Sequence, residues 1–252
     1  MKAALALPLL LALAACATPA RQSGFLTTYS GLAPREGTLR AAILEKKAGP
    51  EAATIRTVRL LPSEVRAATD WLSDGERRLL QREVDAQLCF EVSERYAIAT
   101  TEPADAEVRA AITRVGRTGR AGSVASAAAS FFIPGPIGLR APGTTGGLTA
   151  EAEMVASDGR QFAALVWSRD ATPIGTDNPS LSRVGDALQF AEPFADAAAA
   201  AMTPPDVKPP GPAKPDPCAE YGPRIRPEGW LARFATGLYV PEMSGARPET
   251  QP

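Results

Sequence analysis

The sequence predicts an α+β fold: an antiparallel β-sheet with two main helices packed on one face, followed by a proline-rich C-terminal tail. Three observations predict it. Several short segments alternate apolar and polar residues, as half-buried strands do. Two longer segments repeat apolar residues at helical spacing. Twelve of the 24 prolines lie in the last 49 residues. The predicted order is β-α-β-β-β-β-α, and then the tail.

The first predicted strand and the first predicted helix lie in residues 55–95. Ile55–Leu61 alternates, and Pro62 ends it because proline has no N–H to donate to a sheet. Ser73 and Glu76 have the spacing of a capping box, which predicts a helix that begins there and runs to about Arg95. Its buried stripe repeats every four residues, at Leu80, Val84, Leu88 and Val92.

The remaining predicted strands follow that helix. A short strand is expected at Tyr96–Thr100 and a longer one at Glu107–Val115. Leu148–Ala156 and Phe162–Ser168 flank Asp158-Gly159, and an Asp-Gly pair between alternating segments is a strong hairpin signal. These four segments complete the predicted sheet.

The second main helix is expected to begin at Asn178 and Pro179, which suit the N-cap and the first helical position. Pro193 is expected to kink this helix or to split it near its middle. The apolar face consists of Leu181, Val184, Leu188, Ala191 and Ala195.

The N-terminal residues 1–15, MKAALALPLLLALAA, are typical of a secretory signal peptide, because the apolar run is shorter than the roughly 20 residues of a membrane-spanning helix. Leu13-Ala14-Ala15-Cys16 resembles the lipobox of bacterial lipoproteins, which implies that Cys16 is lipidated and membrane-anchored. An ordinary signal peptide followed by a chance cysteine is the alternative. Ala17 stands where an aspartate would signal retention in the inner membrane, so we expect the outer membrane and its periplasmic face.

The expected domain organisation follows from these segments. Residues 16–24 comprise the lipidated cysteine and a tether, residues 25–203 form the α+β domain, and residues 204–252 form the tail. The tail is expected to fold back on the body, because a disordered segment seldom contains so many large apolar residues. These residues are Tyr221, Trp230, Leu231, Phe234, Leu238 and Tyr239.

Two further cysteines, Cys89 and Cys218, are candidates for a disulfide in an oxidising compartment. A bond between them would hold the tail against the body. Two unpaired thiols are the alternative, since the sequence does not test the geometry that a disulfide needs.

Three stretches carry a family resemblance: SGFLTTYSGL at residues 23–32, VRAAITRV at residues 108–115, and AEMVASDGRQFAALV at residues 152–166. In these stretches, and in the helix VGDALQFAEPFA, the chain resembles the DUF3313 family of bacterial lipoproteins, whose function is uncharacterised. The resemblance covers about residues 20–202 and places Glu153 and Asp158-Gly159 in a hairpin of the family. It implies a fold and no chemistry.

The composition excludes several classes of function. The chain contains no histidine, which excludes Ser-His-Asp and Cys-His catalysis and the usual zinc sites. The net charge of −1 provides no basic field for nucleic acid. We therefore expect no catalytic residue, no metal and no cofactor.

A few polar features keep chemical alternatives open. Glu151 and Glu153 share one face of a predicted strand and could serve as a glycoside-cleaving carboxylate pair; Asp158 and Asp170 are further carboxylates. The simpler interpretation is a solvated face, or an ion pair of Glu153 with an arginine such as Arg109 or Arg114. The glycine-rich stretch at residues 116–123 could cradle an anion, although a flexible connector is the simpler interpretation.

Two apolar groups suggest contacts. The first, a possible contact patch for a partner or the membrane, consists of Phe131, Phe132, Ile133, Ile137 and Leu139; the alternative is that these residues cover one end of the sheet. The second is interpreted as an N-terminal clamp that lays the entering chain against the body, and consists of Phe25, Leu26, Tyr29 and Leu32. The alternative for this second group is an exposed recognition motif.

The sequence favours a non-catalytic lipoprotein of the outer membrane that acts as a scaffold or accessory in an envelope assembly. Its expected partners are the membrane, through the lipid anchor, and an envelope protein. The first alternative is a periplasmic module that binds a lipid or another apolar ligand between sheet and helices. The second is an unusual carboxylate-based enzyme.

Overall fold

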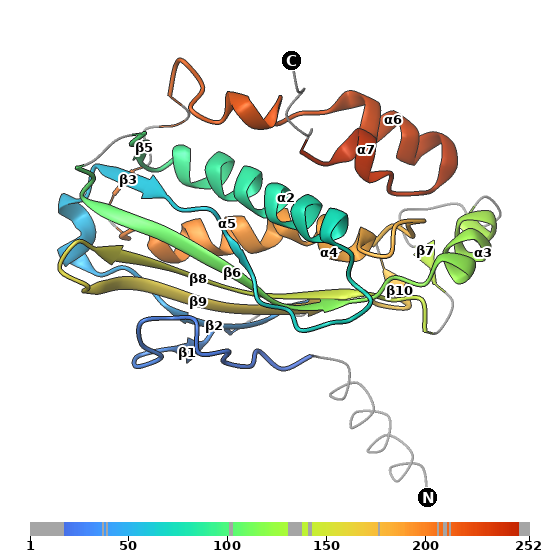
Figure 1. The fold of residues 1–252 in the computed structure, drawn as a ribbon, viewed down its shortest axis with the longest axis horizontal. Helices are drawn as coiled ribbons and strands as arrows, with labels where there is room; N and C mark the ends of the chain where they lie inside the picture. The colour runs from blue at the N-terminus through green and yellow to red at the C-terminus, as the bar shows by residue number, and fades with distance from the viewer. Residues whose placement is uncertain are drawn as a thin grey trace, which may run out of the picture.

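The computed structural model describes residues 18–36, 38, 40–100, 103–130, 138–140, 143–175, 177–205, 207–208, 211 and 213–246. An eight-stranded sheet has helices on one face and the N-terminal segment on the other (Figure 1). The fold class predicted from the sequence, α+β, is confirmed.

The sheet has the strand order β1-β2-β9-β8-β6-β3-β5, and β4 pairs with β6 beyond the end of β3. Its strands are β1 (Ala33–Pro34), β2 (Ala42–Lys46), β3 (Thr57–Leu60), β4 (Glu64–Val65), β5 (Ala97–Ile98), β6 (Ala106–Gly116), β8 (Gly147–Ala156) and β9 (Gln161–Asp170). A separate pair, β7 (Gly138–Leu139) and β10 (Ile174–Gly175), lies near one end of the molecule (Figure 1).

The centre of the sheet is antiparallel, as predicted, but one side is not. β3 runs parallel to both β5 and β6, and β4 also runs parallel to β6. The helix between β3 and β5 is the reason, because a helical crossover returns the chain in its original direction. The sheet is therefore mixed, and the expectation of a wholly antiparallel one is corrected.

The helices are α2 (Asp74–Ser93), α3 (Arg120–Ser130), α4 (Gly185–Gln189), α5 (Ala191–Met202), α6 (Pro227–Thr236) and α7 (Pro241–Ser244), with 3-10 turns at Pro50–Thr54 and Ala219–Tyr221. The capping box of α2 is confirmed: Ser73 Oγ accepts from the Glu76 amide at 3.3 Å, and a Glu76 carboxylate oxygen accepts from the Ser73 amide at 2.9 Å. The predicted apolar stripe of α2 is buried.

The second helical region begins later than expected. Residues 178–184 are not helical, because Ser180 forms a parallel bridge with Tyr239 of the tail. The chain then forms two helices, α4 and α5, that break at Phe190. Pro193 is the third residue of α5, where the missing N–H has no partner within the helix in any case. The expected split therefore occurs three residues before the proline.

The core fills the space between the sheet and the helices. Trp167 of β9 is about 1% exposed, and its ring meets Phe190 and Phe194 edge-on at 6.2 Å. The hairpin of β8 and β9 turns at Gly159, whose φ of +83° suits glycine. Within the described ranges, no helix has the length and apolar character to cross a bilayer.

Candidate functional site

The outer face of the sheet carries two buried carboxylates. Glu151 and Glu153 alternate along β8, and neither side chain is exposed. Arg109 of β6 lies directly opposite Glu153 in the antiparallel register, and its Nε donates to Glu153 Oε1 at 2.6 Å. The cross-strand pairing of Glu153 with Arg109 is therefore confirmed. Arg114, the other candidate, pairs with Asp170 instead.

The N-terminal segment, residues 18–32, covers these carboxylates. The backbone amide of Ser23 and the hydroxyl of Tyr29 each donate to Glu151 at 2.7 Å. The backbone amide of Thr27 donates to Glu153 Oε2 at 2.9 Å, and its hydroxyl donates to Oε1 at 3.1 Å. The N-terminal segment has no strand partner at this point, so its backbone N–H groups need other acceptors. The two glutamates supply these acceptors.

Apolar side chains complete the contact. Phe25 and Leu26 are 6% exposed and pack on the outward-facing residues Ala111, Ala164 and Val166. The guanidinium of Arg109 lies 5.4 Å from the centre of the Phe25 ring. The other two residues of the predicted clamp, Tyr29 and Leu32, are partly buried against the same cluster. All four residues therefore contact the body.

The tether is shorter than expected. The hydroxyl of Thr18 already donates to Asp170 at the end of β9, and Ala20 packs against the apolar cluster. Residues 18–24 lie on the sheet and do not form a free tether. Their contacts with the outer face of the sheet extend from Glu151 to Asp170 at the end of β9. Cys16 and the rest of residues 1–17 lie outside the described residues.

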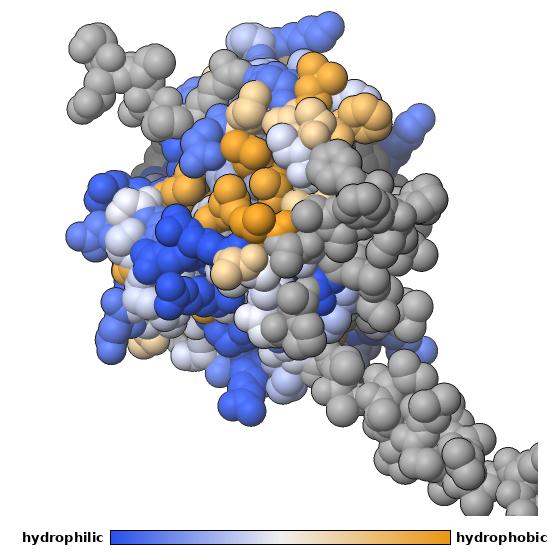
Figure 2. Space-filling view, turned by 90° about the vertical axis from the view of Figure 1, so that its right-hand side faces the viewer, coloured by the Kyte–Doolittle hydropathy of each residue, from blue (hydrophilic) through white to orange (hydrophobic). Residues whose placement is uncertain are grey.

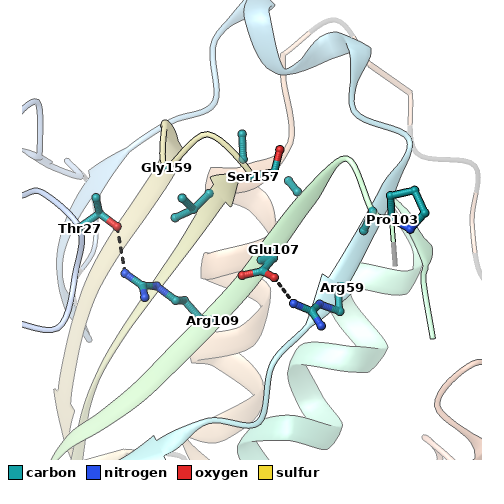
Figure 3. Close-up of a pocket in the computed structure, with 11 residues that line it drawn as sticks. Thr27, Arg59, Pro103, Glu107, Arg109, Ser157 and Gly159 are labelled. Atoms are coloured by element: carbon teal, nitrogen blue, oxygen red, sulfur yellow. Dashed lines mark hydrogen bonds and ion pairs between the residues drawn. The ribbon is translucent and has the colours of Figure 1, made fainter. Parts of the chain in front are cut away.

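A cavity of about 450 Å³ opens beside the segment, at the end of the sheet that carries the β8–β9 turn (Figure 3). Arg59 and Arg109 point into it, with Ser157 and Gly159 along one side. Arg59 forms an ion pair with Glu107, and Arg109 donates to Thr27 at 2.9 Å as well as binding Glu153. Each charged group that lines this cavity therefore has an ion-pair partner.

The carboxylates considered for catalysis are engaged elsewhere. Glu151 and Glu153 are fully buried beneath the N-terminal segment and hold its donors. Asp158 is exposed at the β8–β9 turn near Arg160. Burial raises the pKa of Asp170 and the charge of Arg114 opposes this rise. Among the described residues, no group of His, Cys, Asp and Glu has the arrangement of a metal site.

Arg140 lies in the long stretch of small residues from Gly116 to Gly147, which the sequence predicts to be flexible, and it forms a buried ion pair with Asp186 of α4 that sequence reasoning missed. Arg140 donates to both oxygens of Asp186 at 2.5 and 3.0 Å, and neither side chain is more than 1% exposed. Thr118 and the amide of Gly146 also donate to Asp186, at 2.9 and 2.7 Å. These bonds fix both ends of a stretch expected to be flexible. An arginine inside a loop of glycines and prolines gives no periodic signal of this partner.

The predicted contact patch falls mostly outside the described residues. Phe131, Phe132, Ile133 and Ile137 are not described, and for Leu139 only the backbone, in β7, is described. The anion cradle considered as an alternative at residues 116–123 would use Arg117 and Arg120. In the structure Arg120 Nε donates to the Leu181 carbonyl at 2.7 Å.

The tail contacts the helix layer. Cys89 of α2 and Cys218 form a disulfide with their Cα atoms 5.8 Å apart, so the pairing that the sequence left open is present. Ala246 and the partly buried Tyr221 pack in the same cluster. Trp230, Leu231 and Phe234, however, remain exposed.

Comparison with known proteins places the chain in a family. A family model described as "Protein of unknown function (DUF3313)" matches residues 21–198. The chain belongs to the DUF3313 family. The range that matches the DUF3313 model includes the N-terminal segment from Arg21, both glutamates and most of α5, and it ends before the tail.

Solved structures give a distant likeness. The PelC dodecamer from Paraburkholderia phytofirmans has a TM-score of 0.41 and 7% identity to this DUF3313 chain, and the match covers 65% of this chain and 99% of that one. A point variant of the same dodecamer has a TM-score of 0.38 and 8% identity, with coverage of 64% and 98%. We draw no conclusion from these scores. A search of the curated proteins found no match.

Proposed function

We propose that this DUF3313 chain is a non-catalytic lipoprotein of the outer membrane that faces the periplasm and acts as a scaffold or accessory in an envelope assembly. The observation that carries the proposal is the attachment of the N-terminal segment to the body from Thr18 onward. Cys16, the residue proposed to carry the lipid, precedes Thr18 by two residues. Two extended residues span about 7 Å.

This short distance gives the proposed anchor a structural consequence. A long tether would let the body rotate freely, whereas a segment fixed by Glu151 and Glu153 holds the body in one orientation beside the membrane. The N-terminal segment then faces the anchor, and the helix layer and the tail lie on the opposite side (Figure 1). A fixed orientation is useful to a protein that presents a surface to partners.

The structure offers less support for the alternatives. The space between sheet and helices, where an apolar ligand was considered, is occupied by fully buried side chains such as Trp167, Phe190 and Phe194. The carboxylates considered for catalysis hold the N-terminal segment. Neither observation favours a second function over the scaffold.

The test is made in intact cells. Replacement of Cys16 by Ser is expected to remove palmitate labelling and to move the protein from the outer-membrane fraction to the soluble periplasmic fraction. The control is Glu107→Gln, which changes a partly exposed side chain on the outer face of the sheet and should leave the fractionation of the protein unchanged. Recovery of the Cys16→Ser protein in the outer-membrane fraction, without label, would contradict the anchor.

The scaffold role is tested by photo-crosslinking at exposed positions of the helix side and of the sheet side. In the wild type, positions on the helix side are expected to crosslink to defined envelope proteins. These crosslinks should be lost in Cys16→Ser. Recovery of lipid alone would contradict a scaffold.

A further inference from the structure

The outer surface of the tail is built from α6 and α7, which pack closely on each other. A Cβ atom added at Gly229 of α6 would lie 2.6 Å from Ser244 Oγ and 2.7 Å from the Met243 carbonyl, so glycine is needed there. The tail is held on the body by its backbone: the Tyr239 amide donates to the Pro179 carbonyl at 2.9 Å, and Ser180 donates to the Tyr239 carbonyl at 2.8 Å. One face of α6 is thus fixed, and the other is free of the body.

That free face carries large apolar side chains. Trp230 is 56% exposed and Phe234 is 79% exposed, and their rings stack at 5.6 Å between centres. Leu231 is exposed beside them, and Val124 of α3 and Leu181 are exposed as well. Figure 2, which views the end of the molecule that carries α3 and α6, shows apolar side chains gathered on this end. Exposed apolar groups of this size mark contact surfaces when they gather.

A basic cleft of about 190 Å³ adjoins this face. It is lined by Arg224, Arg226 and Arg233, together with Trp230 and Tyr239. Three guanidinium groups around one small cleft attract an anion, and planar guanidinium groups match the geometry of a carboxylate.

The arginines of the cleft differ in how many of their N–H groups have a hydrogen-bond or ion-pair partner. Arg226 is more than nine-tenths buried and donates to the carbonyls of Ser244 and Tyr221 at 3.0 Å, but its Nε is buried without a hydrogen-bond partner in the described chain. Arg224 pairs with Glu94.

Arg233 is exposed, and its side chain has no partner among the residues that the structure describes. Glu83, buried beneath the tail, accepts from Gln87 and the Ala246 amide, and the charge of Arg226 acts on its carboxyl group. The cleft therefore retains donors for an external acceptor.

The position of the cleft indicates which kind of molecule binds. α6 and α7 lie above the helix layer, on the side opposite the N-terminal segment (Figure 1). With the chain anchored at Cys16, the bilayer lies on the side of that segment, so the cleft faces away from lipid headgroups. A partner that combines negative charge with apolar side chains matches both the arginines and the aromatic face.

We infer that the cleft between α6 and α7, with the adjoining face of α6, binds an acidic and apolar segment of a partner protein. A carboxylate of the segment accepts from the exposed Arg233, with the charges of Arg224 and Arg226 beside it in the cleft, and apolar side chains of the segment pack on Trp230 and Phe234. The inference rests on the proposed scaffold function, because it identifies the surface that the scaffold presents.

The test is a titration of the full chain carrying Cys16→Ser, exported so that Cys89 and Cys218 are oxidised. The probe is the peptide acetyl-Leu-Glu-Leu-Glu-Leu-amide, and the readout is tryptophan fluorescence, which Trp230→Phe should abolish. We expect saturable binding that salt weakens. Arg233→Glu should weaken it by about tenfold or more, because a hydrogen bond to a charged group is lost. Arg160→Glu, at the exposed β8–β9 turn, is the matched control and should leave binding unchanged.

Three results would overturn the inference. Equal binding of acetyl-Leu-Gln-Leu-Gln-Leu-amide, or binding unaffected by Arg233→Glu, would show that the cleft does not select an anion. Arg233-dependent binding to phosphatidylglycerol vesicles without binding to the peptide would assign the cleft to a lipid phosphate and not to a protein. Because the titration uses an unanchored chain, its failure is distinct from a failure of the anchoring test.

Discussion

The two segments that cover this molecule, one near each end of the chain, direct their large aromatic side chains in opposite directions. The N-terminal segment directs Phe25 and Leu26 inward and is held by buried carboxylates. The tail directs Trp230 and Phe234 outward. It is held by a disulfide, by backbone bonds, by the Arg224–Glu94 ion pair and by buried Glu83, which accepts from the Ala246 amide. In the proposed function, the first fixes the position of the body and the second presents a surface to a partner.

The two segments also differ in whether the family model covers them. The family range of residues 21–198 contains the N-terminal segment and its glutamates, and it excludes the tail. The attachment of the N-terminal segment to the sheet thus lies in the DUF3313 part of the chain. The surface proposed for a partner lies in the part that the family model does not cover.

The largest expected effect is the loss of the N-terminal attachment in Glu153→Ala. This change leaves four donors without their acceptor, including the Thr27 amide and the Arg109 guanidinium. The Glu153 carboxylate is fully buried, and each donor left without its acceptor costs about 1–3 kcal/mol, so the loss over several donors should reach about 3–5 kcal/mol of unfolding free energy. Denaturant unfolding measures it. Glu107→Ala, which removes a partly exposed ion pair on the neighbouring strand, should cost less, about 1 kcal/mol. Equal effects of the two changes would contradict the assignment.

A smaller effect is expected from the double variant Cys89→Ser, Cys218→Ser. Loss of a disulfide typically costs about 2–4 kcal/mol. The tail should also become open to proteolysis after Pro204, while the body stays folded. Reduction of the wild type should reproduce both effects, and the double variant should not respond to reductant. If the tail resisted proteolysis equally with and without the disulfide, its other contacts would suffice to hold it.

The smallest effect concerns Glu83, the buried carboxyl under the tail. Burial raises its pKa, while the Ala246 amide, Gln87 and Arg226 oppose this rise. Because the folded-state pKa is raised, the stability contributed by this group is fully present below the ordinary carboxyl pKa of about 4.3 and is lost as pH rises through the raised value.

Glu83→Gln should therefore gain stability relative to the wild type at neutral pH, and the gain should shrink as pH falls. Thermal unfolding over a pH series measures it. Glu242→Gln, on the exposed surface of α7, is the control. A gain that did not change with pH would assign the effect to packing and not to titration.

Periodic signals in the sequence predicted the parts of the fold that depend on local order. The capping box at Ser73, the apolar stripe of α2 and the turn at Asp158-Gly159 each depend on residues that are close together in the sequence. β2 was missed, because Ala42–Lys46 is short and ends in charged residues, and its pairing with β9 is remote in sequence. The start of α4 was missed because Ser180 pairs with the tail, which no local pattern reports.

The site was predictable only in part. Alternation placed Glu151 and Glu153 on one face and allowed the pairing with Arg109, and the crowding of apolar residues at 25–32 predicted a contact with the body. The sequence did not show that the two features contact each other, because 126 positions separate Thr27 from Glu153. The Arg140–Asp186 pair was missed for the same reason.

Amide hydrogen exchange of the full chain tests most directly whether the N-terminal segment is fixed to the sheet. The amides of Ser23 and Thr27, which donate to Glu151 and Glu153, are expected to be strongly protected, and the protection at Thr27 should be lost in Glu153→Ala. The exposed amide of Ser30, bonded only to the Thr28 hydroxyl, should exchange fast in both proteins. Exchange of Ser23 and Thr27 at the rate of an unstructured peptide would show that the segment is a free tether and would contradict a fixed orientation.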